Sequence, residues 1–190
     1  MKWFAMTGMI AIIFAAVIGS PCAAFDVDKS DKQQVNAAQA VATFREKIPR
    51  TETYFDDAYG YAVLPSVTRA GLGFGGAYGK GIVIEGDEVV GTTGFWQFTS
   101  GIQGGAKYFS MIIFFRDKEA LENYKSGKVQ FLGQAGIDVA TVGAAGTPAY
   151  NDGVAIVTMT RFGLMGEFTI SGAKFTFKPA DGKASMETEQ

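Results

Sequence analysis

The sequence predicts an α+β fold: a curved antiparallel β-sheet system, sandwich- or barrel-like, with an N-terminal helix and one mid-chain helix. From residue 61 onward, short runs of β-branched and aromatic residues alternate with glycine-rich breaks, as strands and turns do. Two other stretches, near residues 33–47 and 117–125, repeat apolar residues with helical spacing. The chain also contains 25 glycines, which allow strands to bend sharply and pack closely.

The first helix is predicted over residues 33–47. Ser30 and Gln33 have the spacing of a capping box, in which each side chain satisfies a free N–H of the first turn. Pro49 ends the helix. The apolar residues that share one face of it are Val41, Phe44 and Ile48.

Two further helices are predicted. Residues 51–58 can form a short second helix before Gly60. In the mid-chain helix Asp117 serves as the N-cap, Leu121 and Tyr124 share a face, and Gly127 ends the helix.

The predicted strands are short. They cover residues 61–64, 82–84, 89–98, 111–115, 154–160, 167–170 and 174–177. Three segments between them have the composition of hairpin turns. These segments are Glu85-Gly86-Asp87, Asn151-Asp152-Gly153 and Ser171-Gly172.

The first 24 residues have the organisation of a secretory signal peptide. A charged start at Lys2 precedes an apolar run over residues 3–18, and Cys22-Ala23-Ala24 offers small side chains before a cut after Ala24. The apolar run is shorter than the roughly 20 residues that span a bilayer, so cleavage is favoured over an uncleaved anchor. Lipidation of Cys22 is the less favoured alternative, because Gly19 and Pro21 flank it poorly.

Removal of residues 1–24 leaves 166 of the 190 residues, enough for one domain over residues 25–180. Residues 25–32 form a leader and residues 181–190 a flexible tail. Loss of Lys2 changes the net charge from −2 to −3. No strong basic field is present, so nucleic acid is not an expected partner.

The composition excludes several kinds of catalytic site. The chain has no histidine, and its single cysteine lies in the predicted signal peptide. A Ser-His-Asp site, a histidine general base and the common zinc sites are therefore excluded. We expect no enzyme, no cofactor and no metal site.

Two acidic clusters are candidate sites. Asp56-Asp57 is best explained as a solvated helix end, since neighbours in sequence diverge in a helix. The pattern Asp26-x-Asp28-x-x-Asp31 lacks the glycine and the distal glutamate of a calcium loop.

The pattern Gly71-x-Gly73-x-x-Gly76 matches a dinucleotide-binding fingerprint only in letters. That mechanism needs a helix after the glycines, so that phosphate meets a helix N-terminus. Here Tyr78-Gly79-Lys80-Gly81 leads into a predicted strand. The glycines are therefore interpreted as bending or closely packing a sheet.

Three blocks of the sequence resemble the SYLF lipid-binding domain family. The first is YGYAVLPSVTRAGLGFGGAYGKG at residues 59–81. The second joins Ile112-Ile113-Phe114-Phe115 to the predicted helix at residues 117–124. The third runs from Gly153-Val154-Ala155-Ile156-Val157 through Gly163-Leu164-Met165 to Phe175-Thr176-Phe177. The resemblance covers roughly residues 35–178.

This resemblance implies binding of anionic lipid, and bacterial members are exported or anchored to the envelope. We therefore expect a non-catalytic phospholipid-binding module, periplasmic or envelope-associated, that engages head groups through a local basic, glycine-rich surface. The expected cations are Arg69, Lys80, Lys107 and Arg161, and the expected aromatic contacts are Phe74, Tyr78 and Trp96. The alanine-rich N-terminal helix should pack on the domain rather than insert into a membrane.

Two other classes of function stay open. One is a structural envelope protein whose partner is a protein or the cell wall. The other is a hydrolase that depends on carboxylates alone, which predicts an acidic side chain with a raised pKa in a pocket.

Overall fold

The computed structural model describes residues 25–128, 130–132, 139–141 and 150–180, with the backbone alone described for residues 101–103, 130–132, 139–141 and 162–172. The predicted signal peptide with its cleavage site at Ala24, and the predicted tail at residues 181–190, lie outside these residues.

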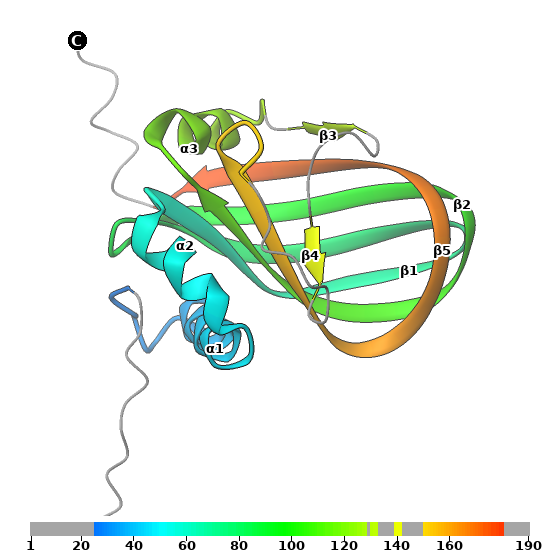
Figure 1. Cartoon of the computed structure of the whole chain (residues 1–190), viewed down its shortest axis with the longest axis horizontal. Helices are drawn as coiled ribbons and strands as arrows, with labels where there is room; N and C mark the ends of the chain where they lie inside the picture. Colours follow the sequence, from blue (N-terminus) through cyan, green and yellow to red (C-terminus); the bar gives the residue numbers. More distant parts are fainter. Residues whose placement is uncertain (1–24, 129, 133–138, 142–149, 181–190) are drawn as a thin grey trace, which may run out of the picture.

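A single antiparallel sheet dominates the domain and is built from three long strands (Figure 1). These strands are β1 (Gly60–Glu85), β2 (Glu88–Phe115) and β5 (Val154–Pro179). Two short strands, β3 (Gln130–Leu132) and β4 (Val139–Thr141), pair with β5, and β4 does so in parallel. The described helices are α1 (Lys32–Lys47), the 3-10 turn η1 (Pro49–Thr51), α2 (Glu52–Asp57) and α3 (Lys118–Lys125). The predicted α+β class with a curved antiparallel sheet is confirmed.

The length of the strands corrects the prediction. The seven short runs belong to three strands of 26, 28 and 26 residues, and the glycine-rich breaks continue the hydrogen-bonded ladder. Ser171-Gly172 lies inside β5 and is not a turn. The turn at Gly86-Asp87 is confirmed, as is a tight turn at Asp152-Gly153, where both residues have positive φ.

Each long strand leaves the helices, curves at the far end of the domain and returns (Figure 1). Gly73 has a φ of 72° and Gly105 a φ of 126°, backbone values that favour glycine over other residues. The two halves of β1 then meet face to face. A Cβ on Gly81 would lie 2.1 Å from the carbonyl oxygen of Val63, so this glycine permits an approach that no side chain would allow.

Apolar side chains fill both faces of the folded sheet. One buried cluster joins the inner face of the strands to α3 and includes Leu64, Phe95, Phe115, Leu121, Tyr124 and Phe175. The other joins the outer face to α1 and α2 and includes Val41, Phe44, Tyr54, Tyr61, Ile82 and Phe114. The N-terminal helix thus packs on the domain, as expected from its sequence.

The helix caps confirm one prediction and correct another. Asp117 accepts a hydrogen bond from the backbone N–H of Ala120 at 2.9 Å, as predicted for the cap of α3. For α1 the cap is Asp31, which accepts from the N–H of Gln33 at 2.7 Å, and not Ser30. Ser30 instead donates to Asp28, and the side-chain amide of Gln33 reaches the carbonyl oxygen of Gly81 at 2.9 Å.

An ion pair joins α3 to the β1–β2 turn and gives a pH-dependent prediction. Lys125 Nζ lies 2.8 Å from Glu85 Oε2, and both side chains are largely buried. Burial acts to raise the pKa of Glu85, but hydrogen bonds from Lys125 and Tyr59 outweigh it and hold the pKa below its ordinary value. A lowered carboxyl pKa stabilises the folded state above the unfolded value of about 4.5 and loses that effect as the pH falls through the folded value.

Replacing Lys125 with methionine should therefore lower the free energy of unfolding by about 1 kcal/mol at neutral pH. The difference from wild type should shrink as the pH falls below about 4.5 and through the lowered pKa at which folded Glu85 becomes protonated. Urea titrations across this pH range measure both effects. Lys128→Met, at an exposed cation just beyond α3, is the control and should give no such pH dependence.

Candidate functional site

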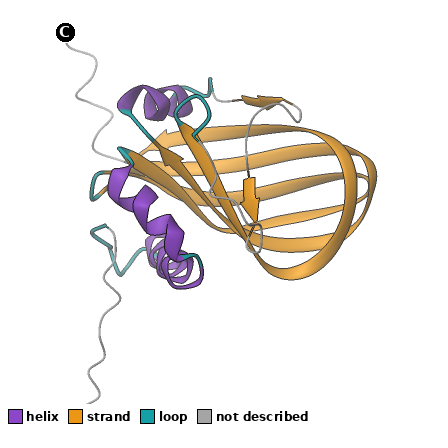
Figure 2. Cartoon of the chain, viewed as in Figure 1, coloured by secondary structure: helices purple, strands orange, loops and turns teal. Residues whose placement is uncertain are grey.

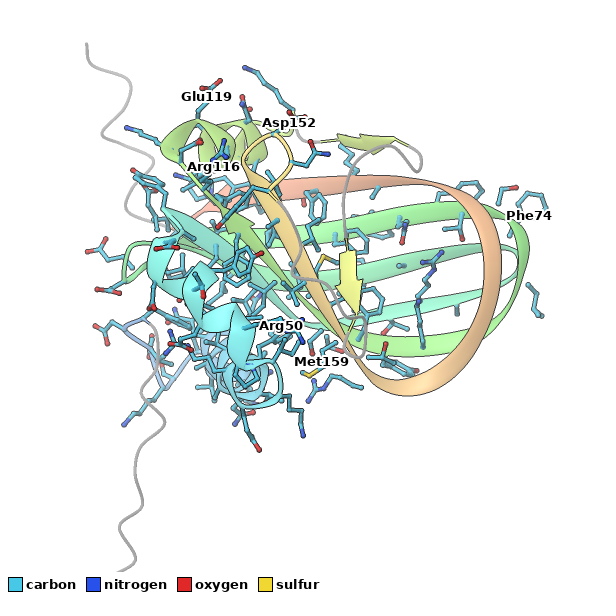
Figure 3. All side chains as sticks on the ribbon, viewed as in Figure 1. Arg50, Phe74, Arg116, Glu119, Asp152 and Met159 are labelled. Carbon is cyan, nitrogen blue, oxygen red and sulfur yellow. The ribbon has the colours of Figure 1, made fainter. Side chains whose placement is uncertain are left out.

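The end of the sheet farthest from the helices exposes large apolar side chains. We call Leu72, Phe74, Tyr78, Trp96 and Phe98 the distal rim. Leu72 is 84% exposed, Phe74 70%, Phe98 65% and Trp96 59%. Figure 3 places Phe74 at the curved end of the strands, with Arg116, Glu119 and Asp152 at the other end. Water-exposed apolar groups gathered in this way mark an interaction surface more often than scattered ones do.

Strand register brings the distal rim together. Tyr78 on β1 pairs with Trp96 on β2, and their ring centroids are 4.6 Å apart. Gly76 pairs with Phe98, and the Phe98 ring lies 6.5 Å from that of Phe74. Alternate residues of a strand point to the same face. The expected aromatic contacts Phe74, Tyr78 and Trp96 thus lie on one outward face of the β1–β2 hairpin.

Two exposed lysines lie beside the aromatic side chains of the distal rim. Lys80 follows Tyr78 by two residues on the same face of β1. Lys174 on β5 pairs directly with Trp96, so it extends the row that Tyr78 begins. The predicted cation Lys80 therefore lies on the same outer face, between the aromatic side chains and α1, whose Gln33 side chain reaches the carbonyl oxygen of Gly81.

The predicted cations Arg69 and Lys107 lie elsewhere. They pair with each other across β1 and β2, and they lie on the inner face with Val67 and Phe109. Arg69 is only 8% exposed, and the ammonium of Lys107 lies 5.8 Å from the centre of the Phe109 ring. Burial separates Arg69 from any surface that a head group could reach directly.

Arg161, the fourth predicted cation, is exposed at an irregular point of β5. Its Nη1 donates a hydrogen bond to the carbonyl oxygen of Pro65 at 3.1 Å. Ser110 donates to the same oxygen at 2.8 Å, beside the bulge between Leu64 and Val67. Arg161 therefore has a structural role in the irregular part of the sheet.

The sequence reasoning missed three residues of this exposed surface. They are Leu72, Phe98 and Lys174. Phe98 could have been found, because it follows Trp96 by two residues and so shares its face. Leu72 and Lys174 depend on the bulge at Gly73 and on pairing with β5, neither of which the sequence shows.

Helices gather at one end of the molecule and strands alone build the other (Figure 2). Charge differs between the helices and the strands. Within β1, β2 and β5 there are six cations and three carboxylates, Glu85, Glu88 and Glu167. The helices and turns at residues 25–59, 86–87, 116–128 and 150–153 contain nine cations and twelve carboxylates. The strands therefore have a net charge of +3 and the helices and turns one of −3.

Two described carboxylates, Asp28 and Glu85, have a pKa displaced downward, Asp28 chiefly by a hydrogen bond from the Ser30 side chain. Asp56 and Asp57 are exposed at the end of α2, as expected. Among the residues that the structure describes, no three histidine, cysteine or acidic side chains gather as metal ligands would.

The fold and the surface together define an α+β domain whose folded sheet presents an aromatic and basic end. No protein-family model matches the chain. The chain is 28% identical over 137 residues to Beta cell expansion factor A of Aeromonas veronii, a match that covers 71% of this chain and 51% of that protein. The chain thus spans about half the length of this curated relative, and the similarity indicates a loose, family-level relationship. Within the described part of the chain, no helix has the length and apolar character needed to cross a membrane.

Proposed function

We propose that this protein is a non-catalytic module that binds anionic phospholipid through the strand-built end of its sheet. The single observation that carries the proposal is the division of charge. The strands have a net charge of +3 although the chain as a whole is acidic. A local field of this kind attracts anionic surfaces within about a Debye length, whatever the net charge of the molecule.

The exposed side chains of that end suit a lipid head group. The ammonium groups of Lys80 and Lys174 are exposed and can donate charge-assisted hydrogen bonds to phosphate. Tyr78 and Trp96, in the adjoining row, have the amphipathic rings that are enriched where apolar and aqueous regions meet. Lys107 is partly exposed on the inner face of the sheet. It adds to the positive field but lies on the opposite face from Tyr78 and Trp96.

The proposal extends to family and location. The three SYLF-like blocks form β1, the end of β2 with α3, and β5, so they make up most of the described fold. The distant similarity to Beta cell expansion factor A is compatible with membership of this family. We place the protein in the periplasm or cell envelope, on the strength of the predicted signal peptide.

Vesicle co-sedimentation tests the proposal. The protein is purified after export with Cys22→Ala, which keeps a small side chain for the signal peptidase and removes any lipid attachment; mass spectrometry verifies the N-terminus. Binding to phosphatidylcholine vesicles should rise with their phosphatidylglycerol content and fall with added salt. Lys80→Gln with Lys174→Gln should weaken the partition coefficient roughly 30-fold, since each lysine near an anionic surface contributes about 1 kcal/mol.

A matched double variant removes the same charge from the other end. Lys29→Gln with Lys128→Gln neutralises two exposed lysines at the helical end and should change binding less than threefold. Equal losses from both double variants would show that net charge, and not the strand-built end, governs binding. Binding that ignores both phosphatidylglycerol and salt would overturn the proposal and leave a protein or cell-wall partner as the better hypothesis.

A further inference from the structure

The distal rim exposes more apolar surface than head-group binding needs. Phosphate contact requires cations, yet the three most exposed side chains of the rim are Leu72, Phe74 and Phe98. None of them can hydrogen-bond to a head group, and each loses contact with water only if something apolar covers it. The rim therefore needs an apolar partner in addition to an anionic one.

The side chains change character in order along the outer face of the hairpin. Leu72, Phe74 and Phe98 lie nearest the bend, Tyr78 and Trp96 form the next row, and Lys80 follows. Successive rows on one face of a strand are about 7 Å apart. Hydrocarbon, interface and phosphate follow one another in the same order from the interior of a bilayer outward, where aromatic rings and lysines take the corresponding places.

The distal rim lies over a packed inner face of the sheet. Phe95 lies beneath it on the inner face and packs against Phe175, with ring centroids 5.1 Å apart. β2 pairs along nearly its whole length with β1 on one side and β5 on the other. A bilayer would thus meet apolar groups already ordered in the free protein, which reduces the entropy lost on binding.

A second copy of the chain fits the rim less well. A stable interface between proteins uses about 20–30 residues on each side, whereas the rim contains five large side chains. Two rims face to face would also bring Lys80 and Lys174 of one copy close to the same lysines of the other, with no carboxylate on the described outer face of the strands to offset them. An anionic bilayer supplies hydrocarbon and negative charge together.

We propose that the bent end of the sheet inserts Leu72, Phe74 and Phe98 into an anionic bilayer, so that the helices face away from the membrane. This orientation rests on the proposed lipid-binding function and adds a direction and a depth to it. The acidic helices and turns, with their net charge of −3, are repelled by the same surface that attracts the strands.

Site-specific fluorescence tests the orientation. In the exported Cys22→Ala protein, Leu72→Cys places an environment-sensitive nitrobenzoxadiazole label on the rim, and Asp56→Cys places the same label on exposed α2 as the control. With vesicles of phosphatidylglycerol and phosphatidylcholine, the label at residue 72 should shift to shorter wavelength and be quenched by lipids brominated on their acyl chains. The label at residue 56 should do neither.

A double substitution tests the contribution of the rim to binding. Phe74→Ser with Phe98→Ser should weaken co-sedimentation with these vesicles at least tenfold, and circular dichroism should match wild type because both side chains are exposed. Gel filtration without lipid should find the same molecular mass for the variant and wild type.

Three results would overturn the orientation. If co-sedimentation persists while residue 72 stays in water or residue 56 becomes quenched, the protein binds lipid in another orientation and the proposed function survives. If wild type is a dimer without lipid and the double variant a monomer, the rim is an interface between copies. If wild type binds no vesicles at all, both the function and the orientation fail.

Discussion

Replacing Gly81 with alanine should destabilise the domain by at least about 3 kcal/mol, the largest effect that we expect from a single added carbon. The new Cβ would lie 2.1 Å from the carbonyl oxygen of Val63, 2.8 Å from its carbonyl carbon and 3.0 Å from the Cα of Leu64. All three neighbours are backbone atoms, so no side-chain rotation relieves the clash. The two halves of β1 would have to separate and open the buried cluster around Tyr61 and Ile82. Urea unfolding followed by circular dichroism measures the loss.

Gly104→Ala is the matched control for this prediction. It makes the same substitution in the same sheet, but the nearest atom to the new Cβ is the end of the flexible Leu72 side chain at 3.8 Å. Its free energy of unfolding should stay within about 0.5 kcal/mol of wild type. Similar losses at both positions would mean that glycine matters here through general backbone preference and not through the contact between the halves of β1.

Replacing Phe114 with alanine should cost about 3–5 kcal/mol. Phe114 is fully buried on β2, and its ring lies 5.3 Å from Tyr54, 4.9 Å from Phe55 and 6.2 Å from Tyr61, centroid to centroid. It therefore joins α2 to the outer face of the sheet. The cavity left by alanine would remove the aromatic contacts of all three neighbours. Thermal or urea unfolding of the purified variant measures the effect.

Phe98→Ala gives the comparison for Phe114. The same residue type is replaced in the same strand, but Phe98 is 65% exposed on the distal rim. Its free energy of unfolding should change by less than about 0.5 kcal/mol. A large loss at Phe98 would show that the rim supports the fold, which would weaken its interpretation as a surface kept for a partner.

Local signals were the reliable part of the prediction. Apolar spacing placed α1 and α3 within one residue of where the structure has them, because burial of one helical face depends on neighbours three and four residues away. Asp117 was recognised as a cap and Gly86-Asp87 as part of a turn, since a few adjacent residues determine each feature. The cap of α1 was misplaced by one residue, which is the usual error when Ser30 and Asp31 both offer a capping oxygen.

The lengths of the strands and the arrangement of the site were not available from local signals. Glycine-rich stretches have the composition of loops, yet Gly79 and Gly81 continue β1 because they face its other half rather than solvent. In the same way, the sequence alone suggests that Arg69 is a surface cation. Only its position on the inner face of β1 shows that it is buried.

The sequence by itself determined the fold class, the helices, the cap of α3 at Asp117, and the presence of Phe74, Tyr78, Lys80 and Trp96 as candidates for contact with a partner. Only the tertiary structure decided that three strands fold over themselves, that Trp96 pairs with both Tyr78 and Lys174, and that Leu72 and Phe98 join them on one face. The reason is physical: residues alternate between faces within a strand, but bends, bulges and pairing between strands decide which faces meet. Those contacts join residues far apart in the chain, and no short stretch of sequence contains them.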